Sequence, residues 1–175
     1  MEFRPFPKIA RLSKDCTICE KIDGTNGSVW IGEDGEIRAG SRNRFITPEN
    51  DNHGFALWVK QNAEELKKLG PGVHFGEWWG VKIQRGYDLH ERRFSLFKAP
   101  KLNLPNTELP SCVSIVPVLY TGTFDTAAVE TCLDILRNQG SMAAPGYMKP
   151  EGVVVYHSAA GVMFKKTLEG DSKNG

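Results

Sequence analysis

The sequence predicts a single α+β domain built mostly from antiparallel strands. Its apolar segments are short and are joined mainly by hairpin-length connections, and only two inserts have helical spacing. No Gly-x-Gly-x-x-Gly or Walker-type loop is present, which argues against a dinucleotide fold or a P-loop. The chain has 175 residues, 40% of them hydrophobic, which is enough for one compact core and too few for two large domains.

The first part of the chain predicts an irregular lead-in followed by strands. Residues 1–14 contain two prolines, and a strand follows that ends at Lys21. The Asp-Gly signal in Glu33-Asp34-Gly35 predicts a tight turn between two further strands. The strands expected here are 15–21, 28–32 and 36–41.

Two short helices are expected next. Phe55, Trp58 and Val59 have the spacing of one helical face. Asn62 followed by Glu65 resembles a capping box, which predicts a second helix that begins at Asn62. Gly70-Pro71 should end it.

The second part of the chain predicts further strands and one longer helix. Asp125 is expected to cap a helix that runs to about Arg137 and ends at Asn138-Gln139-Gly140. Segment 99–110 contains three prolines and reads as a loop, as does 141–150, and 169–175 is expected to be a disordered tail. The strands expected here are 72–78, 92–98, 112–119, 152–157 and 162–168, with a glycine-rich loop at 80–87.

Charge and cysteine content limit the function classes. Lys and Arg number 22 against 21 Asp and Glu, so a polyanion would have to be bound by a local patch. Cys16 and Cys19 have Cys-x-x-Cys spacing, but a structural zinc site needs a second close pair, so we expect them to pack as core residues on opposite faces of a strand. No apolar run approaches the roughly 18 residues of a membrane span, and no signal-peptide core is present, which predicts a cytoplasmic protein without membrane partners.

The segment Cys19-Glu20-Lys21-Ile22-Asp23-Gly24-Thr25-Asn26-Gly27 carries the strongest chemical signal. It places a lysine at the end of a strand, before a turn. Such a lysine can attack the α-phosphate of a nucleotide and form a covalent phosphoramidate. A surface lysine in a β-turn is the alternative, because Lys-x-Asp-Gly arises by chance in on the order of a few per cent of chains this long.

Five segments in order strengthen this interpretation. Besides Glu20 to Gly24 they are Ser41-Arg42-Asn43-Arg44, Gly76-Glu77-Trp78, Glu151-Gly152-Val153-Val154-Val155 and Phe164-Lys165-Lys166. The series, over about residues 15–168, resembles the motifs of covalent nucleotidyltransferases. It is most similar to the ATP-dependent RNA ligase family, which includes phage-type RNA ligases and RNA-editing ligases.

The resemblance implies an adenylation domain of the nucleotidyltransferase fold over residues 1–168, without a C-terminal accessory or OB domain. It implies three steps: AMP is loaded on Lys21, passed to an RNA 5′-phosphate, and displaced by a 3′-hydroxyl. ATP and Mg²⁺ or Mn²⁺ are the implied cofactors, and ATP is preferred to NAD because 14 residues are too few for a nicotinamide-recognising domain. The implied reaction is the sealing of RNA ends in the course of repair, with a partner protein as the source of further nucleic-acid contacts.

The resemblance also implies roles for individual residues. Glu151 would bind the metal, Glu77 the ribose hydroxyls, Phe97 would stack on adenine, and Glu20 would accept from the adenine amino group. The full set implied for the nucleotide is Glu20, Ile22, Asp23, Asn26, Arg42, Glu77, Phe97 and Lys165. The residues expected to hold nucleic acid are Arg42, Arg44, Lys82 and Arg85.

The nucleophile needs a positive neighbour. At an ordinary pKa of about 10.4, fewer than one lysine in ~1,000 is neutral at pH 7. A divalent metal together with Lys165 or Lys166 would favour the neutral amine of Lys21. Adjacent lysines on a strand face opposite ways, so only one can face the site, and Lys165 is preferred.

Three alternatives stay open on the sequence. A DNA ligase-like enzyme and a capping-type nucleotidyltransferase would use the same lysine chemistry. A non-catalytic module that holds RNA ends would keep the fold without turnover. The intact Lys21, Glu77, Glu151 and Lys165 favour the enzyme.

Overall fold

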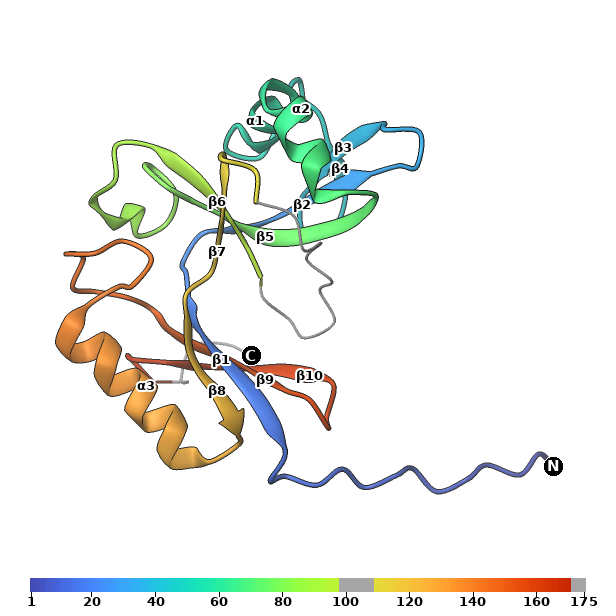
Figure 1. Ribbon diagram of the computed structural model, residues 1–175, viewed down its shortest axis with the longest axis vertical. Helices are drawn as coiled ribbons and strands as arrows, with labels where there is room; N and C mark the ends of the chain where they lie inside the picture. Colours follow the sequence, from blue (N-terminus) through green and yellow to red (C-terminus); the bar gives the residue numbers. More distant parts are fainter. Residues whose placement is uncertain (98–108, 171–175) are drawn as a thin grey trace.

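The computed structural model describes residues 1–97 and 109–170, and it consists of two β-sheets with helices on their outer faces (Figure 1). One sheet has the strand order β10-β9-β1-β8, and the other has the order β4-β3-β2-β5-β6-β7. All strand pairs are antiparallel except β6 with β7. The α+β prediction is confirmed, while most of the predicted loop 99–110 and the end of the predicted tail lie outside the described residues.

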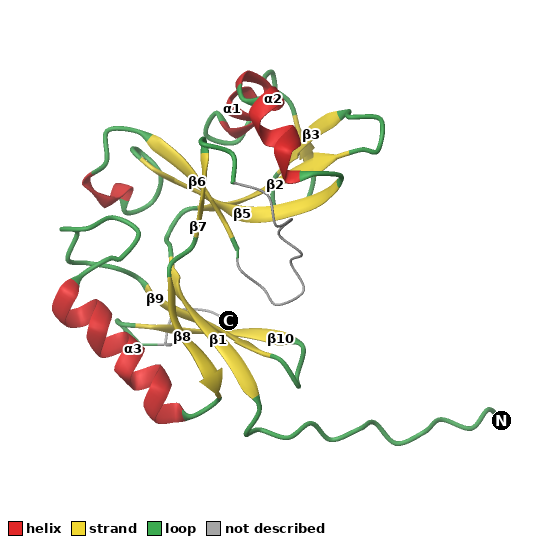
Figure 2. Ribbon diagram, viewed as in Figure 1, coloured by secondary structure: helices red, strands yellow, loops and turns green. Residues whose placement is uncertain are grey.

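The four-stranded sheet carries the longest helix on one face (Figure 2). Its elements are β1 (Asp15–Lys21), β8 (Val118–Thr123), β9 (Gly152–His157), β10 (Val162–Thr167) and α3 (Thr126–Gln139). Leu133 and Leu136 of α3 are fully buried against Ile18 of β1 and Val153 of β9. Asp125 caps α3 as predicted, because its side chain accepts a hydrogen bond from the Ala127 N–H at 2.8 Å.

The six-stranded sheet is covered on one face by the short helices. Its strands are β2 (Thr25–Ile31), β3 (Ile37–Gly40), β4 (Phe45–Ile46), β5 (Gly72–Gly80), β6 (Arg92–Leu96) and β7 (Val113–Ile115). The helices are α1 (Phe55–Gln61), α2 (Ala63–Leu66) and the 3₁₀ turns η1 (Lys67–Leu69) and η2 (Gly86–Asp88). Phe55 and Val59 of α1 pack with Val29, Trp78 and Phe94 of the sheet, so the predicted helical face is confirmed.

The predicted capping box at Asn62 is wrong. The Asn62 side chain caps no N–H of α2, and its Nδ2 donates to the Trp58 carbonyl at 2.8 Å. Asn62 is also the C-cap of α1, directly after its last residue Gln61, so its side-chain amide satisfies a C-terminal carbonyl of that helix. The end of this helical segment at Gly70 agrees with the prediction.

The single strand predicted over 112–119 is two strands in different sheets. β7 pairs with β6 in the six-stranded sheet, and β8 pairs with β1 in the four-stranded sheet. Pro117 separates them and has no N–H to donate to a ladder. Its carbonyl accepts from the Glu20 N–H at 2.9 Å, while the Val116 N–H donates to Leu96 at 3.0 Å. The chain therefore changes sheet at Val116-Pro117.

A third apolar cluster lies between the two sheets. It contains Cys19, Ile22, Trp79, Tyr87, Val116 and Ala144. Cys16, three residues before Cys19, packs instead against α3, so the two cysteines are buried on opposite faces of β1 as expected. Within residues 1–97 and 109–170, no group of three or more His, Cys, Asp or Glu residues is placed to hold a metal ion.

The N-terminal residues 1–14 contain no helix or strand, as predicted, and they extend away from the sheets (Figure 1). None of the helices in the described part of the chain is long and apolar enough to cross a membrane.

Candidate active site at Lys21

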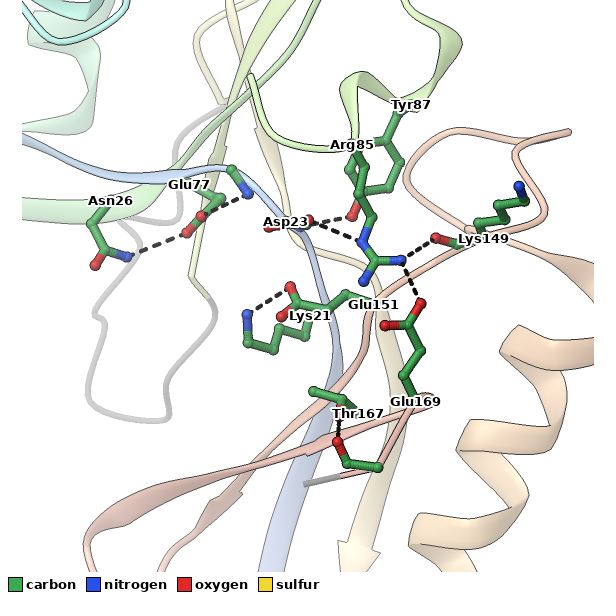
Figure 3. A network of polar contacts seen from close by, with 12 residues as sticks. Lys21, Asp23, Asn26, Glu77, Arg85, Tyr87, Lys149, Glu151, Thr167 and Glu169 are labelled. Atoms are coloured by element: carbon green, nitrogen blue, oxygen red, sulfur yellow. Dashed lines mark hydrogen bonds and ion pairs between the residues drawn. The ribbon is translucent and has the colours of Figure 1, made fainter. Parts of the chain in front are cut away.

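Lys21 is the last residue of β1, at the point where the chain leaves the four-stranded sheet. Its Nζ donates to Oε2 of Glu151 at 2.7 Å, although the two residues lie 130 positions apart in the sequence (Figure 3). The β1–β9 register explains the contact, because Lys21 is opposite Gly152 and Glu151 is the residue before it. Both side chains are mostly shielded from solvent, with exposures of 25% and 17%.

Gly152 is required for this arrangement. Its φ is +155°, and a Cβ there would lie 2.2 Å from the Lys166 carbonyl oxygen. Only glycine lets β9 begin this close to β10. The Glu-Gly pair at 151–152 therefore places a carboxylate beside Lys21.

Glu77 of β5 faces the turn that follows Lys21. Its Oε1 accepts from the Gly24 N–H at 3.1 Å, and its Oε2 accepts from Asn26 Nδ2 at 3.3 Å. Asn26 and Glu77 are directly opposite in the β2–β5 ladder, which puts their side chains on one face of the sheet. A Cβ at Gly24 would lie 2.5 Å from the Trp78 carbonyl oxygen, so the turn approaches β5 closely.

Burial raises the pKa of Glu77 to about 7. The positive charge of Lys21 and the Gly24 N–H oppose this shift, while the nearby carboxylates of Glu151 and Asp23 add to it. Glu77 thus lies close enough to Lys21 and Glu151 for their charges to act on its carboxyl group.

Asp23 is fixed by two residues of the 80–87 segment. Its N–H donates to the Tyr87 hydroxyl at 2.7 Å, and its Oδ2 accepts from Arg85 Nε at 2.9 Å. Tyr87 is buried, and burial raises the pKa of its hydroxyl. Arg85 Nη1 also donates to the Lys149 carbonyl at 3.1 Å and lies 3.8 Å from Glu169 (Figure 3).

Arg85, one of the residues expected to hold nucleic acid, is bonded to groups of this chain. Its side chain is 23% exposed, and its guanidinium joins Asp23 to Lys149 and Glu169. Arg85 thus helps to position Asp23, and its contact with nucleic acid stays a prediction.

The two C-terminal lysines lie on opposite faces of β10. Lys165 is opposite Val154, which is opposite Cys19 of β1, so Lys165 shares a face with Cys19 and Lys21. Lys166 lies on the face of α3 and pairs with Glu130 of that helix. The structure therefore brings Lys165 to the side of Lys21 and does not bring Lys166 there.

Glu20 is enclosed by the loop that follows α3. It is 2% exposed, and its carboxylate accepts from Ser141 Oγ at 2.6 Å and from the N–H groups of Met142 and Ala143 at 2.8 and 2.9 Å. Burial raises its pKa, and these three hydrogen bonds act in the opposite direction. Because Glu20 and Lys21 are neighbours on one strand, their side chains point to opposite faces. The structure gives Glu20 these three partners, and its contact with adenine stays a prediction.

Phe97 and Ile22 lie at the inter-sheet cluster. Ile22 is 3% exposed, so its side chain belongs to the core. Phe97 is half-buried against the same cluster, which includes Cys19 from the face of Lys21. Its N–H donates to the Phe75 carbonyl at 3.0 Å, which continues the β5–β6 ladder beyond Leu96. Phe97 thus lies next to the nucleophile strand with part of its ring accessible.

The remaining predicted basic residues are exposed. Arg42 and Arg44 are in the turn between β3 and β4, and Lys82 follows β5. The turn is closed by the Ser41 N–H, which donates to the Arg44 carbonyl at 2.8 Å, so Arg42 lies at its tip. Within the described residues, no hydrogen bond or ion pair joins these three side chains to Lys21.

The residues around Lys21 fit a hard divalent cation. Mg²⁺ is usually bound by one or two carboxylates, with waters and substrate phosphates completing its shell. Glu151 contacts Lys21, and Glu77 is close enough to both for their charges to affect its pKa. These carboxylate oxygens are suitable ligands for Mg²⁺ or Mn²⁺.

Two parts of the site were not predicted from the sequence: Tyr87 and the loop that encloses Glu20. Tyr87 has no signal in the sequence, because its role depends on left-handed backbone at Lys82, Gln84 and Tyr87 itself. The loop that holds Glu20 could have been anticipated in part, because strand alternation turns Glu20 away from the face of Lys21.

The chain is similar in sequence to one protein family and in fold to several solved structures. A family model described as RNA ligase matches residues 14–167. A search of curated proteins finds no match. Among solved structures, an apo lysine-to-alanine variant of a Naegleria gruberi RNA ligase is similar, with a TM-score of 0.62 and 22% identity over 89% of this chain and 50% of that one.

Two further structures of Naegleria gruberi RNA ligase match to the same extent. One was solved with pyrophosphate and has a TM-score of 0.61 and 22% identity, covering 89% of this chain and 50% of that one. The other, a glutamate-to-alanine variant solved with AMP and Mn, has a TM-score of 0.63 and 20% identity, covering 88% and 49%. The chain spans about half the length of the solved proteins that it matches.

Proposed function

The chain belongs to the RNA ligase family and has its nucleotidyltransferase-type fold, and from this premise we propose that it catalyses the adenylation chemistry of an ATP-dependent RNA ligase. Lys21 is the proposed nucleophile. AMP would pass from Lys21 to the 5′-phosphate of an RNA end, and a 3′-hydroxyl would then displace it. The single observation that carries the proposal is the contact of Lys21 with Glu151 at the junction of the two sheets.

In the first step, Lys21 Nζ attacks the α-phosphorus of ATP. A nitrogen–phosphorus bond forms, the bond from the α-phosphorus to the bridging oxygen breaks, and pyrophosphate leaves. A divalent cation held by Glu151 would neutralise charge on the phosphates.

Lys21 must lose a proton before it attacks. Glu151 accepts a hydrogen bond from Lys21 Nζ, so a cation that takes up the Glu151 carboxylate would free Nζ for attack. Lys165 lies on the same face of the sheet as Lys21, where its charge would face the phosphates of the nucleotide.

The nucleoside would be held by the face of the sheet that carries Glu77. Glu77 offers carboxylate oxygens for the ribose hydroxyls, Asn26 orients Glu77, and the half-buried ring of Phe97 is available to stack on adenine. Arg42, in the exposed turn between β3 and β4, is the proposed contact for a ribose or phosphate group.

The solved relatives support this assignment through the spacing of their substituted residues. In the Naegleria gruberi RNA ligase variants, a lysine and an aspartate lie two positions apart, as Lys21 and Asp23 do. A glutamate and a lysine lie 14 positions apart, as Glu151 and Lys165 do. The match favours Lys165 over Lys166.

The test is covalent labelling with ATP radiolabelled at the α-phosphate, followed by denaturing electrophoresis. The parent should carry label in the presence of Mg²⁺ or Mn²⁺, and Lys21→Ala should carry none. Lys60→Ala, which removes an exposed lysine of α1, is the matched control and should label as the parent does. Equal labelling of Lys21→Ala and the parent would refute the nucleophile, and labelling by GTP in place of ATP would indicate a capping-type enzyme.

A further inference from the structure

Three exposed aromatic side chains lie on one face of the six-stranded sheet, and the adenylation chemistry does not use them. Trp30, Phe45 and Phe75 are 38%, 50% and 49% exposed. Trp30 of β2 is opposite Arg38 of β3. Ser28, two residues before Trp30, is opposite Phe75, and Gly40 is opposite both Ser28 and Phe45. Opposed residues point to the same face, so we define Trp30, Arg38, Phe45 and Phe75 as the aromatic face.

The aromatic face continues directly from the nucleotide site. Asn26, Ser28 and Trp30 alternate along β2, and Glu77 and Phe75 alternate along β5, so all five side chains share one face of the sheet. From Asn26 to Trp30 the strand advances about 13 Å, at roughly 3.3 Å per residue. The opposite face is covered by α1 and α2.

The Trp30 ring is held in place before any ligand binds. Its Nε1 donates to Ser28 Oγ at 3.0 Å, which turns the indole back along β2 toward Asn26. Gly40 leaves the room for this, because a Cβ there would lie 2.4 Å from Ser28 Oγ and 3.1 Å from the indole nitrogen. The Phe45 ring meets the indole edge-on at 5.1 Å, and the Arg38 guanidinium lies 5.7 Å from the Phe45 centroid. A fixed ring loses little conformational entropy when it binds.

A pocket of about 280 Å³ opens at the far end of this face. Its lining residues are Trp30, Ile31, Gly32, Glu36, Arg38, Phe45, Gly72 and Val73. This volume is near the lower limit of small-molecule sites, so it suits one flat ring system. Arg38 Nε donates to Glu36 Oε1 at 2.9 Å. The remaining N–H groups of Arg38 and oxygen of Glu36 offer a donor and an acceptor to the edge of a base. The negative charge of Glu36 disfavours a phosphate at the same place.

We propose that the aromatic face binds unpaired bases of the RNA strand whose end is presented to Lys21. The inference rests on the proposed ligase function and extends it to the substrate. Aromatic rings with a neighbouring arginine are typical of single-strand binding, because every base can stack on a ring. A paired helix keeps its bases stacked on one another, so it offers nothing to these rings. The exposed Arg42 and Arg44, in the turn next to Phe45, are placed to contact the phosphates.

The test compares RNA affinity with adenylation in the same variants. A fluorescently labelled, 5′-phosphorylated single-stranded RNA of 12 nucleotides is titrated at 50 mM salt, and anisotropy is measured. Trp30→Ala and Phe75→Ala should each weaken binding by about 5- to 150-fold, the range for the loss of one stacked base. Trp30→Phe keeps a ring and should stay within about 3-fold of the parent. Leu57→Ala, which shortens an exposed apolar side chain of α1, is the control and should leave affinity unchanged.

Labelling with ATP separates this inference from the proposed function. The first step needs no RNA, so Trp30→Ala and Phe75→Ala should form the Lys21 adenylate as the parent does, which also shows that they are folded. Unchanged RNA affinity in both variants would overturn the aromatic face as a base-binding site. A larger loss of affinity for an RNA duplex than for the single strand would also overturn it. So would a parent that elutes as a dimer in size-exclusion chromatography while both variants elute as monomers and keep the RNA affinity of the parent. A parent that binds RNA through Trp30 but forms no adenylate would instead contradict the proposed function.

Discussion

Replacing Glu77 by glutamine should make the protein more stable at neutral and alkaline pH. Glu77 is 8% exposed, and its pKa is raised from 4.5 to about 7, chiefly by burial. Between these two values the folded state binds more protons than the unfolded state, so this group lowers the free energy of unfolding as pH rises through that window. At 1.36 kcal/mol for each pKa unit, the full cost is about 3 kcal/mol above pH 7.

Glutamine removes this cost and keeps the shape of the side chain. Its amide oxygen can still accept from the Gly24 N–H, and Asn26 can rotate its amide to accept from the new NH₂ group. The stability of Glu77→Gln relative to the parent should therefore increase by about 2 to 3 kcal/mol between pH 5 and pH 8.

Urea unfolding followed by circular dichroism at pH 5, 6, 7 and 8 measures this difference. Glu33→Gln removes the same charge from an exposed position in the β2–β3 turn and should leave the pH profile of the parent unchanged. Parallel profiles for Glu77→Gln and the parent would refute the reasoning. The same variant should form less lysyl adenylate, because a neutral amide is a weaker hydrogen-bond acceptor for ribose hydroxyls than a carboxylate.

Two further changes test the assignment of single residues. Lys165→Ala should reduce adenylate formation strongly and Lys166→Ala only slightly, because Lys165 shares the face of Lys21 and Lys166 pairs with Glu130; equal losses in the labelling gel would contradict the face assignment. Phe97→Ala should weaken ATP binding by roughly 1 to 3 kcal/mol in calorimetry if the ring stacks on adenine. Unchanged affinity together with a lower melting temperature would make Phe97 a core residue only.

Local patterns predicted most of the elements. The alternation in β1, the Asp125 cap and Gly140 end of α3, and the hairpin of β9 and β10 all depend on residues close in sequence. The prediction of one strand over 112–119 was wrong, because the division of this segment depends on partners distant in the sequence. Val113–Ile115 pairs with β6, and Val118–Thr123 pairs with β1. Pro117 marks the break, but a proline does not show that the chain moves to another sheet.

The candidate site was predictable through its motifs and not through its contacts. The resemblance supplied Lys21, Glu77 and Glu151 as a set, and the structure brings their charges together. The role of Arg85 could not be inferred, because a basic residue in a glycine-rich loop reads equally as a nucleic-acid contact. Its pairing with Asp23 depends on backbone geometry in the 80–87 segment that local composition does not determine.

The alternation of β1 assigns different tasks to two adjacent charged residues. Lys21 faces the site, while Glu20 points to the other side and fixes the start of the loop after α3 through Ser141, Met142 and Ala143. The end of that loop is fixed by the β1–β9 register, which begins at Gly152. Glu151 is therefore held from both sides, and the strand that carries the nucleophile also positions its carboxylate partner. This explains why a buried carboxylate directly before the nucleophile contributes to the geometry at Lys21 without contacting it.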